Sequence, residues 1–80
     1  MVRFFFDFRA AEWPSRDEEG TELSDVEAAH GEALGALADA ICDVVAEGQI
    51  DQHLVVAVRD ELGPVLEVTA VLNSRILRKH

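Results

Sequence analysis

The segment from Ser24 to Gly48 constrains the fold most strongly, because it contains no proline and its apolar residues recur at helical spacing. Ser24 and Glu27 form the capping-box pattern that begins many helices. Asp25 and Glu27 also place negative charge at the positive end of the helix dipole. Gly48 is the residue type that most readily adopts the left-handed conformation at a helix C-terminus. We therefore expect one long helix over Ser24–Gly48.

At about 100° per residue, this helix presents three faces of different character. The first carries large apolar side chains and is expected to face the core: Val26, Leu34, Leu37, Ile41, Val44 and Val45. The second carries only acids and is a candidate surface for a basic partner: Asp25, Glu32, Asp39, Asp43 and Glu47. The third carries only small residues: Ala28, Gly31, Gly35, Ala38, Cys42 and Ala46.

The two glycines of the small-residue face need an explanation, because each costs about 1 kcal/mol relative to alanine inside a helix. Gly31, Gly35, Ala38 and Cys42 would let another backbone approach closely, for example a second copy of the same helix. In that case Cys42 would approach its symmetry mate. The alternatives are that this face packs against a loop of the same chain, or that the glycines are simply tolerated.

Three segments have the alternation of β-strands. In Arg3–Arg9 every second residue is Phe4, Phe6 or Phe8, which predicts one apolar face directed at the helix. His53–Arg59 and Val65–Ala70 are rich in β-branched residues. The intervening Asp60–Gly63 is typical of a hairpin turn in which glycine supplies a positive φ.

These elements predict a single α+β domain over residues 1–80, with one amphipathic helix on a three-stranded, mainly antiparallel sheet. We expect the strands, numbered along the chain, in the order 1-3-2, with a right-handed crossover through the helix. Ala10–Leu23 is expected to be a loop, with a short extra strand near Trp13 as the alternative. The basic residues 71–80 are expected to be flexible or docked. The uncovered sheet face is a second candidate interface, formed by Phe5, Val55 and Val65.

The charge of the chain argues against nucleic acid as a partner. The formal charge is −9, and no Lys or Arg lies between Arg16 and Arg59, where eleven Asp and Glu are found. Binding to phosphate backbones needs clustered positive charge. An acidic surface is either a solvated face or a surface for a basic protein.

The size of the chain and its cysteine content favour self-association. An 80-residue chain buries about 60–65% of its unfolded surface, so domains of this size often depend on disulfides, metals or oligomerisation. A single cysteine excludes an intramolecular disulfide and suits a reducing compartment. No apolar run is long enough for a membrane span or a secretory signal. We expect a cytoplasmic homodimer that does not bind membranes.

Patterns that carry chemistry are not found. Placing Gly20 at position six of a calcium loop puts Ser15 and Val26 where acids are required. The three histidines show no metal-ligand spacing; His30 is either a buried, pH-sensitive group or an exposed residue at the core edge. Cys42 lies among acids, which disfavour a reactive thiolate. We expect no catalytic, cofactor-binding or metal-binding residues, no cofactor and no enzymatic activity.

Three blocks of sequence stand out by their order and spacing: Arg3-Phe4-Phe5-Phe6-Asp7, then Asp17-Glu18-Glu19-Gly20-Thr21-Glu22-Leu23, then Val58-Arg59-Asp60-Glu61 with Gly63. Together they resemble a family of short uncharacterised bacterial proteins that carry a domain of unknown function. The likeness covers most of Arg3–Ala70. It implies a compact cytoplasmic α+β protein and no activity. Helices of that family usually carry Arg or Lys, and this helix carries none, so no partner is inferred from the family.

Three interpretations of function follow. The leading one is a small protein-interaction module that acts as a homo-oligomer through the small-residue face or the uncovered sheet face. The second is a regulatory or antitoxin-like protein whose acidic helix face, at Glu32, Asp39, Asp43 and Glu47, binds a basic partner. The third is a small metal protein or enzyme, for which the sequence supplies no site.

Overall fold

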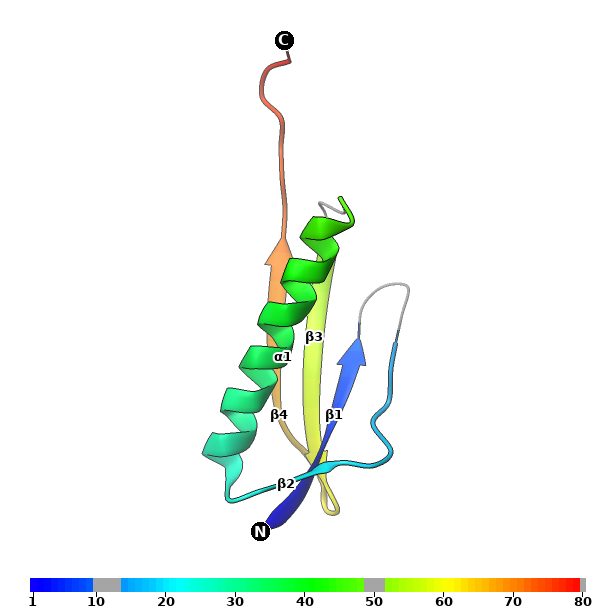
Figure 1. The fold of residues 1–80 in the computed structure, drawn as a ribbon, viewed down its shortest axis with the longest axis vertical. Helices are drawn as coiled ribbons and strands as arrows, with labels where there is room; N and C mark the ends of the chain where they lie inside the picture. The colour runs from blue at the N-terminus through cyan, green and yellow to red at the C-terminus, as the bar shows by residue number, and fades with distance from the viewer. Residues whose placement is uncertain (10–13, 49–51, 80) are drawn as a thin grey trace.

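One helix packs on one face of a four-stranded antiparallel sheet (Figure 1). The computed structural model describes residues 1–9, 14–48 and 52–79. The elements along the chain are β1 (Val2–Arg9), β2 (Thr21–Leu23), α1 (Val26–Ala46), β3 (Gln52–Asp60) and β4 (Gly63–Leu72). The predicted α+β class, the single long helix and the three main strands are therefore confirmed. Trp13 and most of the expected connector after the helix lie outside the described residues.

The predicted strand order 1-3-2 is wrong. The sheet order is β2-β1-β3-β4, so β1 pairs directly with β3 and not with the returning strand of the hairpin. The cause lies before the helix, where the chain returns along the edge of β1: Ser15 bridges to Phe8 and Thr21 pairs with Phe4. The helix therefore starts near the beginning of β1 and ends near its other end (Figure 1). From there β3 runs antiparallel to β1, and no crossover is needed. The additional strand among the described residues is β2, and the alternative of a short strand near Trp13 lies outside them.

The β3–β4 hairpin follows the expected turn chemistry. Asp60 pairs with Gly63 across the two residues Glu61 and Leu62, and the Leu62 N–H donates to Asp60 Oδ1 at 2.8 Å. Gly63 has a φ of 126°, which its lack of a Cβ allows. The register shifts at Val58/Arg59.

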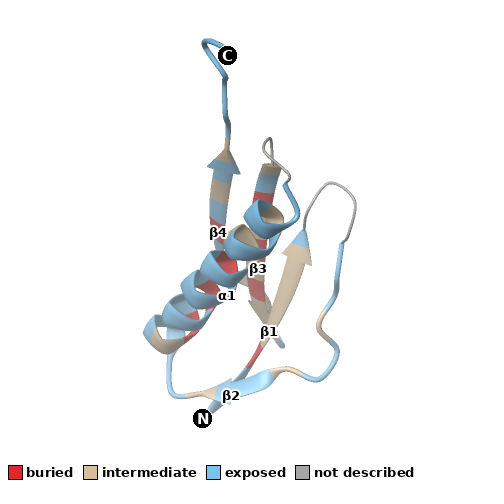
Figure 2. Ribbon diagram, turned by 45° about the horizontal axis from the view of Figure 1, so that its top comes forward, coloured by how far each residue is buried: buried red, intermediate tan, exposed pale blue. Residues whose placement is uncertain are grey.

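The core lies between α1 and the strands β3 and β4 (Figure 2). The predicted inward face of β1 is confirmed, since Phe4 is buried and Phe6 and Phe8 pack against the core. The fully buried large side chains come from the sheet alone: Phe4, Leu54, Val56 and Val58.

The helix turns a different face to the sheet from the one expected. Its buried residues are Ala29, Ala33 and Leu37, whereas three residues assigned to the core are exposed: Val26, Leu34 and Val45. Large side chains of the sheet already fill the space between the two layers, so the helix approaches closely only where its own side chains are methyl groups. Leu37 is buried as expected, and Ile41 and Val44 are partly buried.

The ends of the helix differ slightly from expectation. Asp25, not Ser24, is the N-cap, and its carboxylate accepts a hydrogen bond from the Ala28 N–H at 2.9 Å. Gly48 follows the C-cap with a φ of 79°, as expected for a glycine that ends a helix.

Residues 73–79, which we call the tail, are exposed and lead away from the body of the domain (Figure 1). They continue beyond the end of β4 and past the C-terminal end of α1. The molecule is therefore elongated, with principal extents of 55 × 22 × 17 Å.

Candidate functional site

The loop before β2 is held on β1 by the carboxylate of Asp17. Asp17 Oδ2 accepts a hydrogen bond from the Phe6 N–H, and Oδ1 accepts from the N–H groups of Glu19 and Gly20, each at 3.1 Å. Asp7 Oδ1 in turn accepts from the Asp17 N–H at 3.0 Å. Two side chains thus replace the strand ladder between the Ser15 bridge and β2.

Gly20 closes this loop at a position where only glycine fits. Its φ is 75°, and a Cβ there would lie 2.8 Å from Arg3 Cγ and 2.9 Å from Phe5 Cε2. The loop consequently packs directly on the sheet face that the helix leaves free.

Arg59 joins the two aspartates across the sheet. Its Nε donates to Asp7 Oδ2 at 2.9 Å, and its Nη2 donates to the Asp17 carbonyl oxygen at 2.6 Å. Its guanidinium also lies 4.5 Å from the centroid of the Phe5 ring, a cation–π contact. The Arg59 and Asp7 side chains are only 23% and 19% exposed. We call Asp7, Asp17 and Arg59 the aspartate–arginine network.

Both carboxylates of this network are held ionised. Burial acts to raise the pKa of Asp7, but the hydrogen bond from Arg59, the Asp17 N–H and the charge of Arg59 together bring it below its ordinary value. The Gly20 N–H is the main cause of the lowered pKa of Asp17; burial opposes it, and the N–H groups of Phe6 and Glu19 add to it. A general acid needs a raised pKa, so these carboxylates act as structural acceptors.

Beside this network lies an open groove of about 840 Å³ on the helix-free face, between β1, β3, β4 and residues 14–16. Three arginines contribute to its walls, but two are engaged: Arg59 in the network and Arg9 with the carboxylate of Glu67. The third, Arg16, is exposed and takes part in no ion pair within the described part of the chain.

The side of α1 that points away from the sheet is apolar. At about 100° per residue its centre, at Gly31, Gly35 and Cys42, lies opposite the buried Ala29, Ala33 and Leu37, while Leu34 and Val45 lie at one edge of it. We call it the outward face; it is exposed and consists of Gly31, Leu34, Gly35, Ala38, Cys42 and Val45. Leu34 is 47% and Val45 57% exposed.

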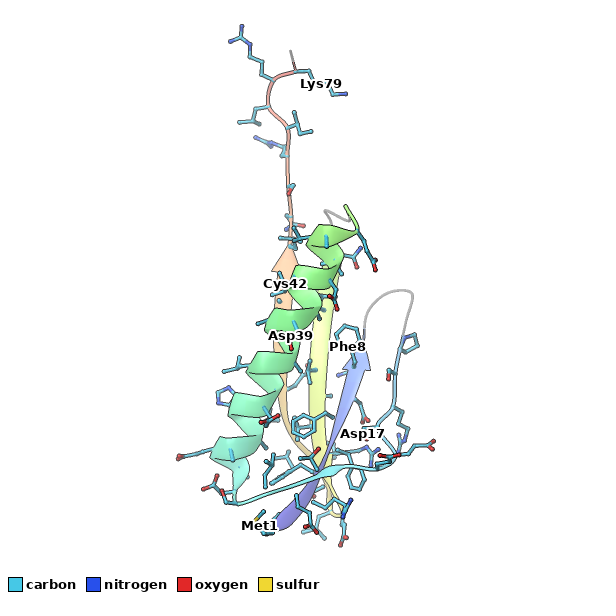
Figure 3. The ribbon with its side chains drawn as sticks, viewed as in Figure 1. Met1, Phe8, Asp17, Asp39, Cys42 and Lys79 are labelled. Atoms are coloured by element: carbon cyan, nitrogen blue, oxygen red, sulfur yellow. The ribbon has the colours of Figure 1, made fainter. Side chains whose placement is uncertain are left out.

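The predicted interface residues of the helix are therefore brought together on one open surface. Cβ atoms added at Gly31 or Gly35 would meet nothing within 4 Å, so no part of the chain that the structure describes explains these glycines. The acids Glu32, Asp39, Asp43 and Glu47 are exposed along one side of this surface. Figure 3 shows Asp39 and Cys42 on α1.

The predicted sheet-face residues are not brought together in this way. Phe5 lies under the Arg59 guanidinium, and Val55 is only partly exposed between Arg9 and Thr69. Val65 lies at the register shift, packs against the core and also lines the groove. Their role in an interface stays a prediction.

Comparison with known families decides where the chain belongs. The model of a domain of unknown function, DUF6894, matches residues 3–71. The chain belongs to the DUF6894 family. No curated protein and no solved structure matches it.

The blocks that carried the resemblance to an uncharacterised family now have a structural meaning in this DUF6894 domain. Asp7 comes from the first block, Asp17 and Gly20 from the second, and Arg59 from the third. From the sequence these residues were named in separate blocks and were not recognised as one network. The signal was present, because charged residues occupy fixed places in strands that are otherwise apolar, but the strand order that brings them together was missing.

Residues 1–9, 14–48 and 52–79 of the DUF6894 chain contain no metal-ligand cluster and no membrane-spanning helix. No three His, Cys, Asp or Glu side chains there are placed to hold a metal ion. His30 is exposed. No helix in these ranges is long and apolar enough to cross a membrane.

Proposed function

We propose that this DUF6894 protein is a non-enzymatic protein-interaction module that works as a cytoplasmic homodimer, and that it associates through the outward face of α1. The observation that carries the proposal is that, beyond its first turn, α1 carries uncharged small and apolar residues on the side that faces away from the sheet. A helix that covers one face of a sheet normally turns charged residues to water on the far side. Here that side presents Gly31, Gly35, Ala38 and Cys42, and the exposed Leu34 and Val45 lie at its edge.

The glycines favour a helix, and not a flat surface, as the partner of this face. Gly31 and Gly35 each cost about 1 kcal/mol relative to alanine. Since nothing in the described chain lies within 4 Å of their missing Cβ atoms, the space they leave is available to a second molecule. Small residues on a helix allow close approach of a second backbone.

The apolar area on this face gives an estimate of the free energy of dimerisation. Full burial of a Leu or Val side chain contributes about 1.5–3 kcal/mol, so burying the exposed halves of Leu34 and Val45 contributes about 1 kcal/mol each. Two copies give about 4 kcal/mol, which is the lower bound of the cost of association. Contact along α1 alone therefore predicts a weak dimer, and a stable one requires further contacts.

The test compares two substitutions of identical chemistry on the same helix. Ala38→Glu introduces a charge on the outward face, whereas Ala36→Glu introduces it at an exposed position on the acidic side. Light scattering behind a sizing column, over about a hundredfold range of concentration, should give a dimer for the wild type and Ala36→Glu and a monomer for Ala38→Glu. A wild-type monomer throughout that range would refute the proposal, as would an Ala38→Glu dimer.

A further inference from the structure

The tail combines apolar and basic residues that the described body does not cover. Ile76 is 71% and Leu77 78% exposed. Arg75, Arg78 and Lys79 are exposed and form no ion pair within the described residues. Figure 3 shows Lys79 at the far end of the tail, well away from the sheet.

The outward face of α1 has the complementary character. It offers Leu34 and Val45 to an apolar side chain, and the acids Glu32, Asp39 and Asp43 lie beside it. These three acids form no ion pair within the described part of the chain, and no Lys or Arg occurs in α1. The tail contains no acid.

We propose that the tail of one copy docks on the outward face of α1 of a second copy, and that this exchange is reciprocal in the dimer. This inference rests on the proposed function and names the partner of its surface. The basic residues pair with the acids that line one edge of the outward face, and Ile76 and Leu77 pack against its small and apolar residues beside the contact between the two helices. The exchange supplies the additional contacts that the helix faces alone lack.

The lengths agree with this arrangement. Seven extended residues span about 23–25 Å. The eleven steps from Leu34 to Val45 rise about 17 Å along the helix axis. A tail in extended conformation can therefore run along the whole apolar part of the outward face.

The direction of the tail indicates a second copy. It continues past the C-terminal end of α1 of its own chain instead of turning back over it (Figure 1). A two-fold arrangement provides two such contacts for one association event, because an isologous interface uses each surface twice. Docking on the helix of the same chain is the competing arrangement, and it predicts a monomer.

A charge exchange tests the proposal directly. The tail variant carries Arg75→Glu, Arg78→Glu and Lys79→Glu, and the helix variant carries Glu32→Lys, Asp39→Lys and Asp43→Lys. Each variant on its own places like charges on the tail and on the helix that receives it, so its dimerisation Kd should rise at least tenfold. In a 1:1 mixture each tail meets a helix of opposite charge, and the heterodimer should form with a Kd within about threefold of the wild type. Both variants keep a net negative charge, since the chain starts at −9, so general attraction does not explain recovery.

The outcomes separate this inference from the proposed function. A wild-type dimer that both variants retain would overturn tail docking and leave the helix interface in place. Variants that stay monomeric when mixed would also overturn it. A wild type that is monomeric at all concentrations would overturn both proposals. Glu18→Lys with Glu61→Lys, which reverses exposed acids outside α1, is the control and should dimerise as the wild type does.

Cross-linking gives a second, independent measurement on the unaltered chain. Lys79 is the only lysine, so apart from the N-terminus it is the only primary amine that a carbodiimide can join to a carboxylate. In an equal mixture of ¹⁴N- and ¹⁵N-labelled protein, we expect mixed-isotope products linking Lys79 to Asp39 or Asp43. Products of a single isotope only would show docking within one chain and overturn the exchange.

Discussion

Replacing Arg59 by methionine should destabilise the domain far more than the same change at Arg9. Both arginines lie on the helix-free face and pair with a carboxylate of another strand: Arg59 with Asp7 on the adjacent β1, and Arg9 with Glu67 on β4, across β3. The Arg59 and Asp7 side chains are 23% and 19% exposed, whereas those of Arg9 and Glu67 are 56% and 55% exposed. The comparison therefore changes burial while keeping the chemistry nearly constant.

The magnitude follows from the contacts of Arg59. Its two hydrogen bonds, to Asp7 and to the Asp17 carbonyl, are each of a type worth about 1.5–3 kcal/mol. The contact with Phe5 adds about 0.5–1 kcal/mol, and solvent screening reduces the whole. We expect Arg59→Met to cost about 3 kcal/mol. Methionine keeps much of the aliphatic volume over Phe5, so the loss reports mainly on the polar contacts. Exposed ion pairs contribute about 0–1 kcal/mol, which is the expectation for Arg9→Met.

Urea denaturation followed by circular dichroism measures both free energies of unfolding. An 80-residue domain has about 4–12 kcal/mol of stability, so the loss at Arg59 should move the midpoint strongly. Because dimerisation also stabilises the folded state, all variants are compared at one protein concentration and again at a tenfold higher one. Equal costs at Arg59 and Arg9 would refute the role given to the aspartate–arginine network.

Two further predictions concern pH and the helix start. The pKa values of Asp7 and Asp17 lie below the ordinary value of 3.8, so their stabilising effect is complete above that pH and is lost as pH falls through the lowered values. Acid titration should therefore show a free energy of unfolding that decreases below about pH 4, and Asp7→Asn or Asp17→Asn should flatten this dependence; a wild-type profile as flat as theirs would contradict it. Asp25→Ala should cost about 1 kcal/mol in urea denaturation because it removes the N-cap, whereas Ser24→Ala should cost almost nothing. Equal losses of stability in Asp25→Ala and Ser24→Ala would contradict the assignment of Asp25 as the N-cap.

The elements themselves could be predicted because their causes are local. The alternation of Phe4, Phe6 and Phe8, the position of Gly63 in the hairpin turn and the glycine after the helix all act within a few residues. Each was read from spacing and confirmed, apart from a small shift in the helix start.

The order of the strands could not be predicted from such spacing. It depends on the return of the chain along β1, and that return is fixed by contacts between residues far apart in sequence. Arg59 donates to the Asp17 carbonyl across 42 positions and to Asp7 across 52 positions. No local pattern indicates that an aspartate in a loop will replace the hydrogen bonds of a strand.

The incorrect prediction of the core residues of α1 and the candidate interface on this helix have the same cause. Ala29 and Ala33 are buried because Phe4 and Leu54 already fill the volume between helix and sheet. A sequence pattern assigns the larger residues to that contact, and in this chain they are displaced from it. Leu34 and Val45 consequently lie on the flank of α1 between its buried side and the small residues, half exposed. In a monomer this arrangement leaves apolar surface in water, and in an assembly it is buried. Local pattern and structure tend to disagree where a surface serves function, and Leu34 and Val45, two of the three residues assigned wrongly to the core, belong to the surface on which the interface is expected.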